Sequence, residues 1–89
     1  MATLSFTPNL LRHVPTPSAR IAGATVHQVL DNYFQGNPEV RTYVLDDQGM
    51  VREHVTIFVN QEMIRDRHGL TDQVNEHDEI FVMQALSGG

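Results

Sequence analysis

Apolar and polar residues alternate with a period of two at the start of this 89-residue chain. Leu4 and Phe6 alternate with Thr3, Ser5 and Thr7, which predicts a half-buried strand that stops at the Pro8 turn. Residues 10–18 contain two prolines and therefore predict a loop, and residues 18–22 predict a weak second strand closed by a glycine.

The pattern then changes to a helical period. Thr25 can accept a hydrogen bond in the first turn, and Gln28, three residues later, can complete a capping box. The apolar residues that follow are spaced i, i+3, i+4, i+7 and i+8, and a single stripe of this kind must pack against another element. The stripe consists of Val26, Val29, Leu30, Tyr33 and Phe34, and the helix is expected to end at Gly36-Asn37-Pro38.

The second half of the chain predicts mostly strands and turns. Residues 38–41 predict a short turn of helix, residues 42–45 a short extended piece, and residues 46–49 a turn. Residues 55–59, Val-Thr-Ile-Phe-Val, are the strongest strand and are expected at the centre of a sheet. Asn60-Gln61 predicts a two-residue reversal into residues 62–64. Residues 71–74 predict a short helical turn, and residues 79–84 the last strand.

This order of elements predicts an α+β fold: a mixed sheet of four to five strands with one main helix packed across one face. We expect the helix residues Val26, Val29, Leu30 and Phe34 to pack on Val55, Ile57, Val59, Ile80 and Val82. The length allows a single domain, residues 1–85, followed by a flexible tail, residues 86–89.

Composition excludes several classes of function. A net charge of −5 with only six Lys+Arg disfavours nucleic acid as a partner and favours a basic protein surface. With no cysteine, the chain has no thiol nucleophile and no zinc ribbon. We find neither a signal peptide nor an apolar run of membrane-spanning length, so we expect a cytoplasmic protein without membrane contact.

Candidate catalytic and metal-binding patterns are weak. The five histidines form no His-x-x-x-His pair, and we predict no metal site. The acidic residues near 46–47 and 76–79 lack the spacing of a calcium loop and predict solvated turns. Without a phosphate-binding loop or a nucleophile elbow, we predict no catalytic residues.

The distinctive feature is the last five residues, Ala85-Leu86-Ser87-Gly88-Gly89. Glycine has no Cβ, so a Gly-Gly segment is narrow enough to enter a tight channel of another enzyme. The terminal carboxylate would then be a substrate. The alternation that turns Ile57, Val59, Ile80 and Val82 inward also turns Phe58, Phe81 and Met83 outward, and we predict that these three dock a partner.

The run Asp78–Gly89, together with Phe58-Val59-Asn60-Gln61-Glu62, resembles the ubiquitin-like sulfur carriers of the MoaD/ThiS family. The sequence departs from the family pattern at His77 and at Leu86-Ser87. The resemblance implies a β-grasp fold and a protein that is not an enzyme and binds no cofactor. It also implies that a partner activating enzyme uses ATP to adenylate the Gly89 carboxylate, which a sulfur donor converts to a thiocarboxylate. Gly88 would then keep the main chain narrow enough to enter the active site of that enzyme, and Ser87 and Leu86 would form the segment that leads to it.

The segment 59–65, followed by Gly69-Leu70, looks most like the carrier of cysteine synthesis, with molybdopterin synthesis next. The partners implied are the adenylating enzyme, a synthase that accepts the sulfur and a metalloprotease that releases the product. Two alternatives stay open. The chain could be a protein modifier joined to lysines through Gly89, or an interaction domain that binds without covalent chemistry.

Overall fold

The computed structural model describes residues 1–7 and 18–84. The predicted loop at 10–18 lies almost entirely outside the described residues, and the expected tail, 86–89, lies wholly outside them. The described elements follow the order β1 (Ala2–Phe6), β2 (Ala19–Ile21), α2 (Val26–Gly36), α3 (Pro38–Val44), β3 (Val55–Val59), β4 (Glu62–Met63) and β5 (Glu79–Gln84).

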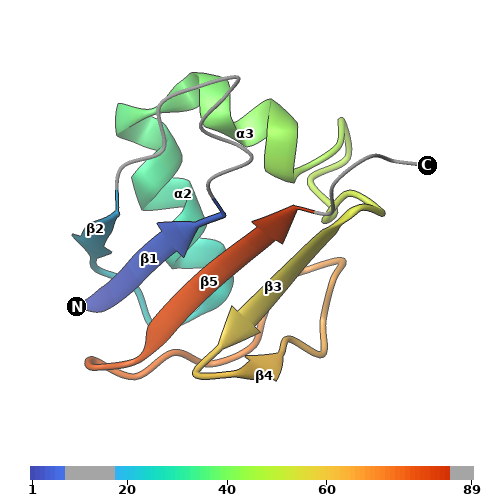
Figure 1. The fold of residues 1–89 in the computed structure, drawn as a ribbon. Coiled ribbons are helices and arrows are strands. Elements are labelled where there is room, and N and C mark those ends of the chain that lie inside the picture. Colours follow the sequence, from blue (N-terminus) through green and yellow to red (C-terminus); the bar gives the residue numbers. More distant parts are fainter. Residues whose placement is uncertain (8–17, 85–89) are drawn as a thin grey trace.

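The strands form a single five-stranded sheet in the order β2-β1-β5-β3-β4, with both helices against one face (Figure 1). β1 and β5 pair in parallel, and the other neighbours pair antiparallel. The expected α+β, β-grasp arrangement is confirmed. Strand β3 lies inside the sheet as expected, with β5 on one side and β4 on the other, and β5 takes the middle position among the five described strands.

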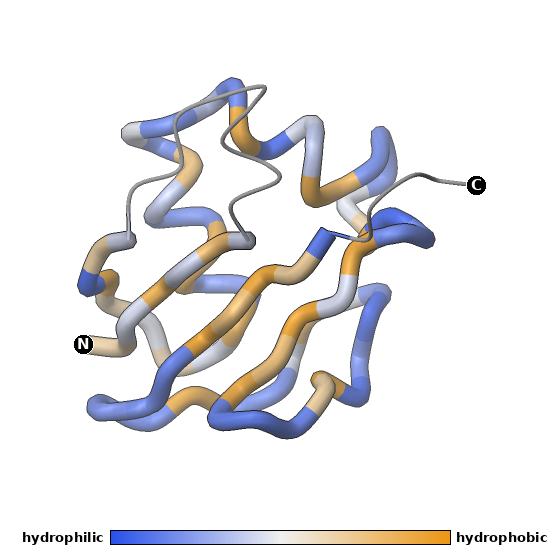
Figure 2. Tube along the Cα trace, in the orientation of Figure 1, coloured by the Kyte–Doolittle hydropathy of each residue, from blue (hydrophilic) through white to orange (hydrophobic). Residues whose placement is uncertain are grey.

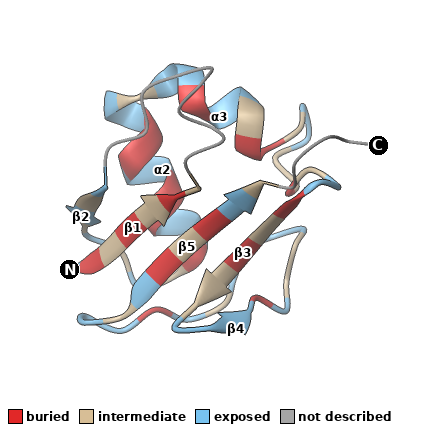
Figure 3. Ribbon diagram, viewed as in Figure 1, coloured by how far each residue is buried: buried red, intermediate tan, exposed pale blue. Residues whose placement is uncertain are grey.

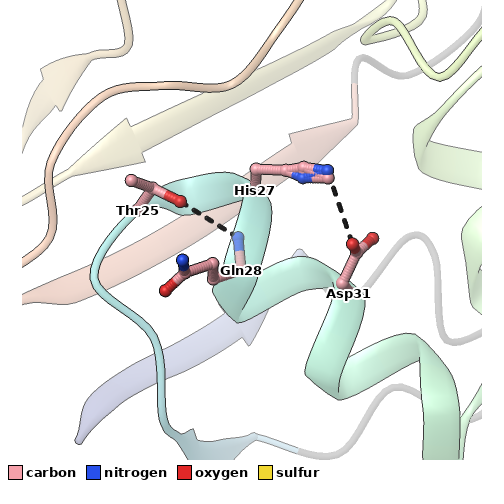
Figure 4. Close-up of polar contacts among 4 residues, drawn as sticks. All are labelled: Thr25, His27, Gln28 and Asp31. Atoms are coloured by element: carbon pink, nitrogen blue, oxygen red, sulfur yellow. Dashed lines mark hydrogen bonds and ion pairs between the residues drawn. The ribbon is translucent and has the colours of Figure 1, made fainter.

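Helix α2 begins as its capping residues predict. The Thr25 hydroxyl accepts a hydrogen bond from the backbone N–H of Gln28 at 3.2 Å (Figure 4). The Gln28 side chain in turn accepts from the backbone N–H of Ala24 at 2.8 Å, one residue earlier than in the usual capping box. Both ends of the first turn are therefore fixed by side chains that the sequence places three residues apart.

Gly23 permits this helix to approach strand β2. Its φ is +156°, and an added Cβ would lie 2.7 Å from Cγ2 of Val29 and 2.8 Å from the Val29 backbone nitrogen. A side chain here would collide with the first turn of α2, so the position requires glycine.

The core lies between α2, α3 and the covered face of the sheet. Red segments alternate with lighter ones along β1, β3 and β5 in Figure 3, which shows the period of two directly. The expected packing is confirmed, since one buried cluster contains the whole helix stripe and the inward residues Val55, Ile57, Ile80 and Val82, with Val59 partly buried against it.

Helix α3 corrects the prediction of an extended piece at residues 42–45. The helix starts at Pro38, continues to Val44, and its last turn is closed by a hydrogen bond from the Leu45 N–H to the Arg41 carbonyl at 2.8 Å. Val40 and Val44 are both fully buried. Their i, i+4 spacing aligns them on one helical face, and burial of that face outweighs the extended preference of the residues between them.

Residues 71–74 are not the helical turn that the sequence predicts. Gln73 forms a bridge to Thr25, and the carbonyls of Leu70 and Asp72 accept hydrogen bonds from the N–H groups of His27 and Val26. These two donors belong to the first turn of α2 and have no partner within the helix. The segment is extended because it satisfies them.

Carboxylates at the turns accept backbone hydrogen bonds and do more than solvate the corners. Asp46 accepts from the N–H groups of Gln48 and Met50, and Asp66 from those of His68 and Gly69 and from the Thr71 hydroxyl. These donors stabilise the charged form, and the N–H of Gly69 with the Thr71 hydroxyl lowers the pKa of Asp66 to about 2.

The substitution Leu30→Ala tests the packing of α2 on the sheet. Leu30 is 1% exposed, and truncation leaves a cavity, so we expect a loss of about 2–5 kcal/mol in the free energy of unfolding. Urea denaturation measures it. Gln35→Ala, at an exposed position of the same helix, is the control and should change stability by about 0.5 kcal/mol or less. Equal stability of the two variants would contradict the packing.

The substitution Asp66→Asn tests the turn carboxylate through pH. The folded pKa of Asp66 lies below its ordinary 3.8, so its contribution to stability is present above pH 3.8 and is lost as the pH falls toward about 2. We expect the difference in unfolding midpoint between wild type and Asp66→Asn to shrink across this window. The control is Asp47→Asn, since the Asp47 carboxylate accepts no hydrogen bond within the described part of the chain. A difference that is constant with pH would refute the assignment.

Candidate functional site

The face of the sheet turned away from the helices carries large apolar side chains. As the alternation predicts, Ile57, Ile80 and Val82 are buried, whereas Phe58 and Phe81 are partly exposed and Met83 is 41% exposed. Apolar residues follow one another along β3 and β5 in Figure 2. Both faces of these two strands are therefore apolar, although only one is covered by helices (Figure 1).

Strand register joins these side chains into one row. Phe81 lies opposite Phe58, and Phe58 lies opposite Met63 of β4, which is 63% exposed. We call Phe58, Met63, Phe81 and Met83 the outward patch. Sequence reasoning missed Met63, although the signal was available: a two-residue reversal at Asn60-Gln61 pairs residue 62 with 59 and residue 63 with 58.

A hollow of about 560 Å³ lies over three of these four residues, Met63 being outside it. Phe58, Phe81 and Met83 form its apolar part, and Asn60, Gln61 and Glu79 form its polar part. Volumes of about 300–1,000 Å³ are typical of binding pockets. The hollow therefore offers an apolar surface with a polar rim on one side, the arrangement found at protein interfaces.

Asn60 fixes the polar side of the hollow. Its backbone is left-handed, with φ +57°, and its side chain donates to the Asp78 carboxylate at 2.7 Å and accepts from the Glu79 N–H at 2.9 Å. The Asp78 carboxylate also accepts from the Asn75 N–H, and these two donors lower the pKa of Asp78. The reversal after β3 is thereby held to the start of β5.

The end of β5 is held by the strands on both sides. The Gln84 N–H donates to the Thr7 hydroxyl at 3.2 Å, the Thr7 N–H donates to the Val82 carbonyl at 3.1 Å, and Val55 of β3 lies opposite Gln84. The predicted tail residues Leu86, Ser87, Gly88 and Gly89 lie outside the described residues. The structure therefore shows the point where the tail segment begins, at the middle of the sheet and at the end of the strand that carries Phe81 and Met83.

Other polar groups lie apart from this face. His27 and Asp31, one turn apart on α2, form an exposed ion pair at 3.4 Å when the histidine is protonated (Figure 4). Within residues 1–7 and 18–84, no three His, Asp or Glu side chains gather closely enough to hold a metal ion. Neither described helix has the length and apolar character needed to cross a bilayer.

Comparison with solved structures supports the fold. The chain superposes on a structure from the crystal of the Amycolatopsis orientalis BexX/CysO complex with a TM-score of 0.84, at 23% identity, covering 100% of both chains. Mycobacterium tuberculosis CysO matches with a TM-score of 0.81, at 22% identity, over 97% of this chain and 100% of that one. SAMP1 from Haloferax volcanii matches with a TM-score of 0.77, at 23% identity, over 99% and 98%.

Sequence comparison gives the family. No curated protein sequence matches this chain. The model of the ThiS family matches residues 13–89, which is most of the chain and includes the Gly88-Gly89 segment. Together with the five-stranded fold and the position of β5, this match confirms the family that the sequence resembles: the chain belongs to the ThiS family.

Proposed function

We propose that this protein is a sulfur carrier whose Gly89 carboxylate is adenylated by an activating enzyme and converted to a thiocarboxylate. The observation that carries the proposal is the family match, which continues through Gly88 and Gly89. The structure supports it by holding Gln84, four residues before Gly88 in the sequence, between two strands. We further propose that the carrier itself is not an enzyme, and that it works in the cytoplasm, where ATP is available to its partner.

The chemistry requires only a free carboxylate from this chain. An oxygen of the carboxylate attacks the α-phosphorus of ATP, and pyrophosphate leaves. A sulfur donor that acts as hydrosulfide then attacks the carbonyl carbon and forms a C–S bond. The C–O bond to AMP breaks, and AMP leaves with the electron pair. Adenylation is needed because a carboxylate oxygen is a poor leaving group until it is bonded to phosphorus. Gly88, which has no side chain, would let the C-terminus enter the narrow active site of the activating enzyme. Ser87 and Leu86 would form the segment that precedes it there.

The outward patch is the surface we propose for docking the activating enzyme. Phe81 and Met83 lie on β5, the strand that precedes the tail in the sequence, so an enzyme bound to them would also hold the residue from which the tail starts. Aromatic and methionine side chains are enriched at protein interfaces. Since the chain carries a net charge of −5, a basic rim on the partner would complement it.

Cysteine synthesis is the pathway we favour, and molybdopterin synthesis comes next. One matched structure is described as CysO and another as a BexX/CysO complex, which supports this order. The carrier would deliver its sulfur to a synthase, and a metalloprotease would release the product from the C-terminus. Finding the gene for a cysteine synthase or for a molybdopterin synthase large subunit beside this one would decide between the two pathways.

A second candidate function is modification of other proteins. It is favoured by the matches to SAMP1 from Haloferax volcanii and Methanosarcina acetivorans, described as small archaeal modifier protein 1 in the latter. The same adenylate would then be attacked by a lysine amine of a target and form an isopeptide bond at Gly89. Binding without covalent chemistry, the third alternative, would use the outward patch alone.

Intact mass spectrometry tests the thiocarboxylate. After incubation with the adenylating enzyme of the source organism, ATP and sulfide, the wild-type chain should gain the mass that corresponds to replacement of one oxygen by sulfur. A variant lacking Gly88 and Gly89 is the control and should keep its mass. An unchanged wild type, or the same gain in the truncated variant, would refute the carrier function. Lysine-linked conjugates in cell extract, lost on the same truncation, would support the modifier function.

Alanine substitutions in the outward patch test the docking surface. Met63→Ala, Phe81→Ala and Met83→Ala should each weaken the complex with the activating enzyme by about 1 kcal/mol or more, because truncation of an interface anchor has this effect. Their melting temperatures should stay close to that of the wild type, most closely for the two exposed methionines. Gln35→Ala, on the helical side, is the control and should bind normally. Loss of stability with normal binding would show that these residues belong to the core.

A further inference from the structure

The positively charged side chains of this protein are all of one kind. The sequence contains six Lys+Arg residues, and six positions are arginine: Arg12, Arg20, Arg41, Arg52, Arg65 and Arg67. The chain therefore contains no lysine, and it contains no cysteine either. This composition matters for a protein whose own carboxylate is made reactive, because amines and thiols are the side chains that attack activated acyl groups most readily.

Arginine does not react as lysine does. A guanidinium has a pKa above about 12 and remains protonated and delocalised at neutral pH, whereas a lysine amine with a pKa of about 10.4 always has a small neutral fraction. Serine and threonine hydroxyls are weak nucleophiles unless a general base activates them. Among the described residues, the Ser18 hydroxyl donates to the Ser5 hydroxyl at 3.1 Å, and neither oxygen is a base. The Thr71 hydroxyl donates to the Asp66 carboxylate at 2.7 Å, but the N–H of Gly69 and this hydroxyl lower the pKa of Asp66 to about 2, so that this carboxylate is a poor base for activating a nucleophile.

The structure divides the described arginines into two groups. Arg52 donates from Nε to the Thr42 carbonyl of α3 at 2.7 Å, and Arg67 donates from Nη2 to the Arg52 carbonyl at 2.7 Å. Both side chains therefore hold the segment around residue 52 in place. Arg20, Arg41 and Arg65 are exposed. These three are the surface positions at which a lysine would be open to attack an activated carboxylate.

One amine does exist in the structure. The α-ammonium of Met1 lies 3.9 Å from Oε1 of Glu76, and both groups are exposed. An acyl group transferred to it would join two copies head to tail in an ordinary peptide bond. A branched product, in which Gly89 of one copy is joined to a side chain of another, requires a nucleophile that the sequence does not contain.

We infer that this chain is a donor only: once activated at Gly89, it cannot acylate the side chains of its own copies, so its thiocarboxylate forms without competing branched self-conjugates. The inference rests on the proposed function. It deepens that function in two ways. In a carrier, even at high concentration, the adenylate would react with the sulfur nucleophile and not with a lysine of another copy. A modifier would attach to its target as single copies, since an attached copy has no lysine to which the next could be joined.

The excluded step is defined by its atoms. A lysine amine would attack the Gly89 carbonyl carbon, a C–N bond would form, the C–O bond to AMP would break with its electron pair, and the nitrogen would release a proton. The five histidines can accept an acyl group, but an acyl imidazole is itself reactive and passes the group on to water or hydrosulfide, so that no stable branched product remains.

The test introduces the missing nucleophile. The full chain is prepared with an α-thioester at Gly89 by intein cleavage, which activates the carboxyl group without any partner enzyme. The variants are Arg20→Lys and Arg65→Lys, with Arg20→Gln and Arg65→Gln as matched controls that remove the charge and add no amine. Each is incubated at high concentration, products are separated by mass, and linkages are mapped by tandem mass spectrometry. Melting temperatures establish that all variants fold, and added hydroxylamine establishes that the thioester is reactive.

We expect branched dimers from the two lysine variants, linked at the new lysine, and none from the wild type or the glutamine variants. Branched dimers in the wild type, linked through any side chain, would overturn the inference. It would also be overturned if the lysine variants formed none while hydroxylamine reacted, because lysine content would then not be what prevents the reaction. A parallel incubation with the activating enzyme and ATP measures pyrophosphate release. Failure of that reaction alone would refute the proposed function and leave the thioester result to decide the inference.

Discussion

The parallel pairing of β1 with β5 is the constraint on which the rest of the structure depends. Leu4 lies opposite Ile80 and Phe6 opposite Val82, so the first strand of the chain is the neighbour of the last. Parallel neighbours need a long crossover connection, and here α2 lies within it and covers one face of the sheet. The same pairing places β5 in the middle, with a partner on each side. Every later feature, including the position from which the tail segment starts, follows from this arrangement.

The central position of β5 links stability to the proposed function. Its inward residues, Ile80 and Val82, are 1% exposed and belong to the core, whereas Phe81 and Met83 face the other way. One strand therefore belongs to the core through one face and carries part of the outward patch on the other. Under the proposed function, the partner would supply the catalytic groups, and this strand would join the docking surface to the core.

The turns show how an acidic protein of this size uses its carboxylates. Asp46, Asp66 and Asp78 each accept backbone N–H groups, which lowers the pKa of all three. Asn60 adds a second kind of clamp, since it takes the left-handed conformation and bonds to both Asp78 and Glu79. These carboxylates therefore hold turns in place. Under the proposed function, the low reactivity of arginine toward acyl groups would suit a chain whose carboxyl group is activated.

Local patterns predict the strands at 2–6, 55–59 and 79–84, the helix from Val26 and the two faces of the sheet, because periods of two and 3.6 are properties of neighbouring residues. The sequence also indicates the family through the Gly88-Gly89 segment. Tertiary structure decided the rest. Residues 71–74 are extended because the N–H groups of another segment, the start of α2, need acceptors, and residues 42–44 are helical because Val40 and Val44 are buried together. Met63 joined the outward patch, and β5 rather than β3 took the centre, because strand pairing is a contact between distant segments that no local pattern contains.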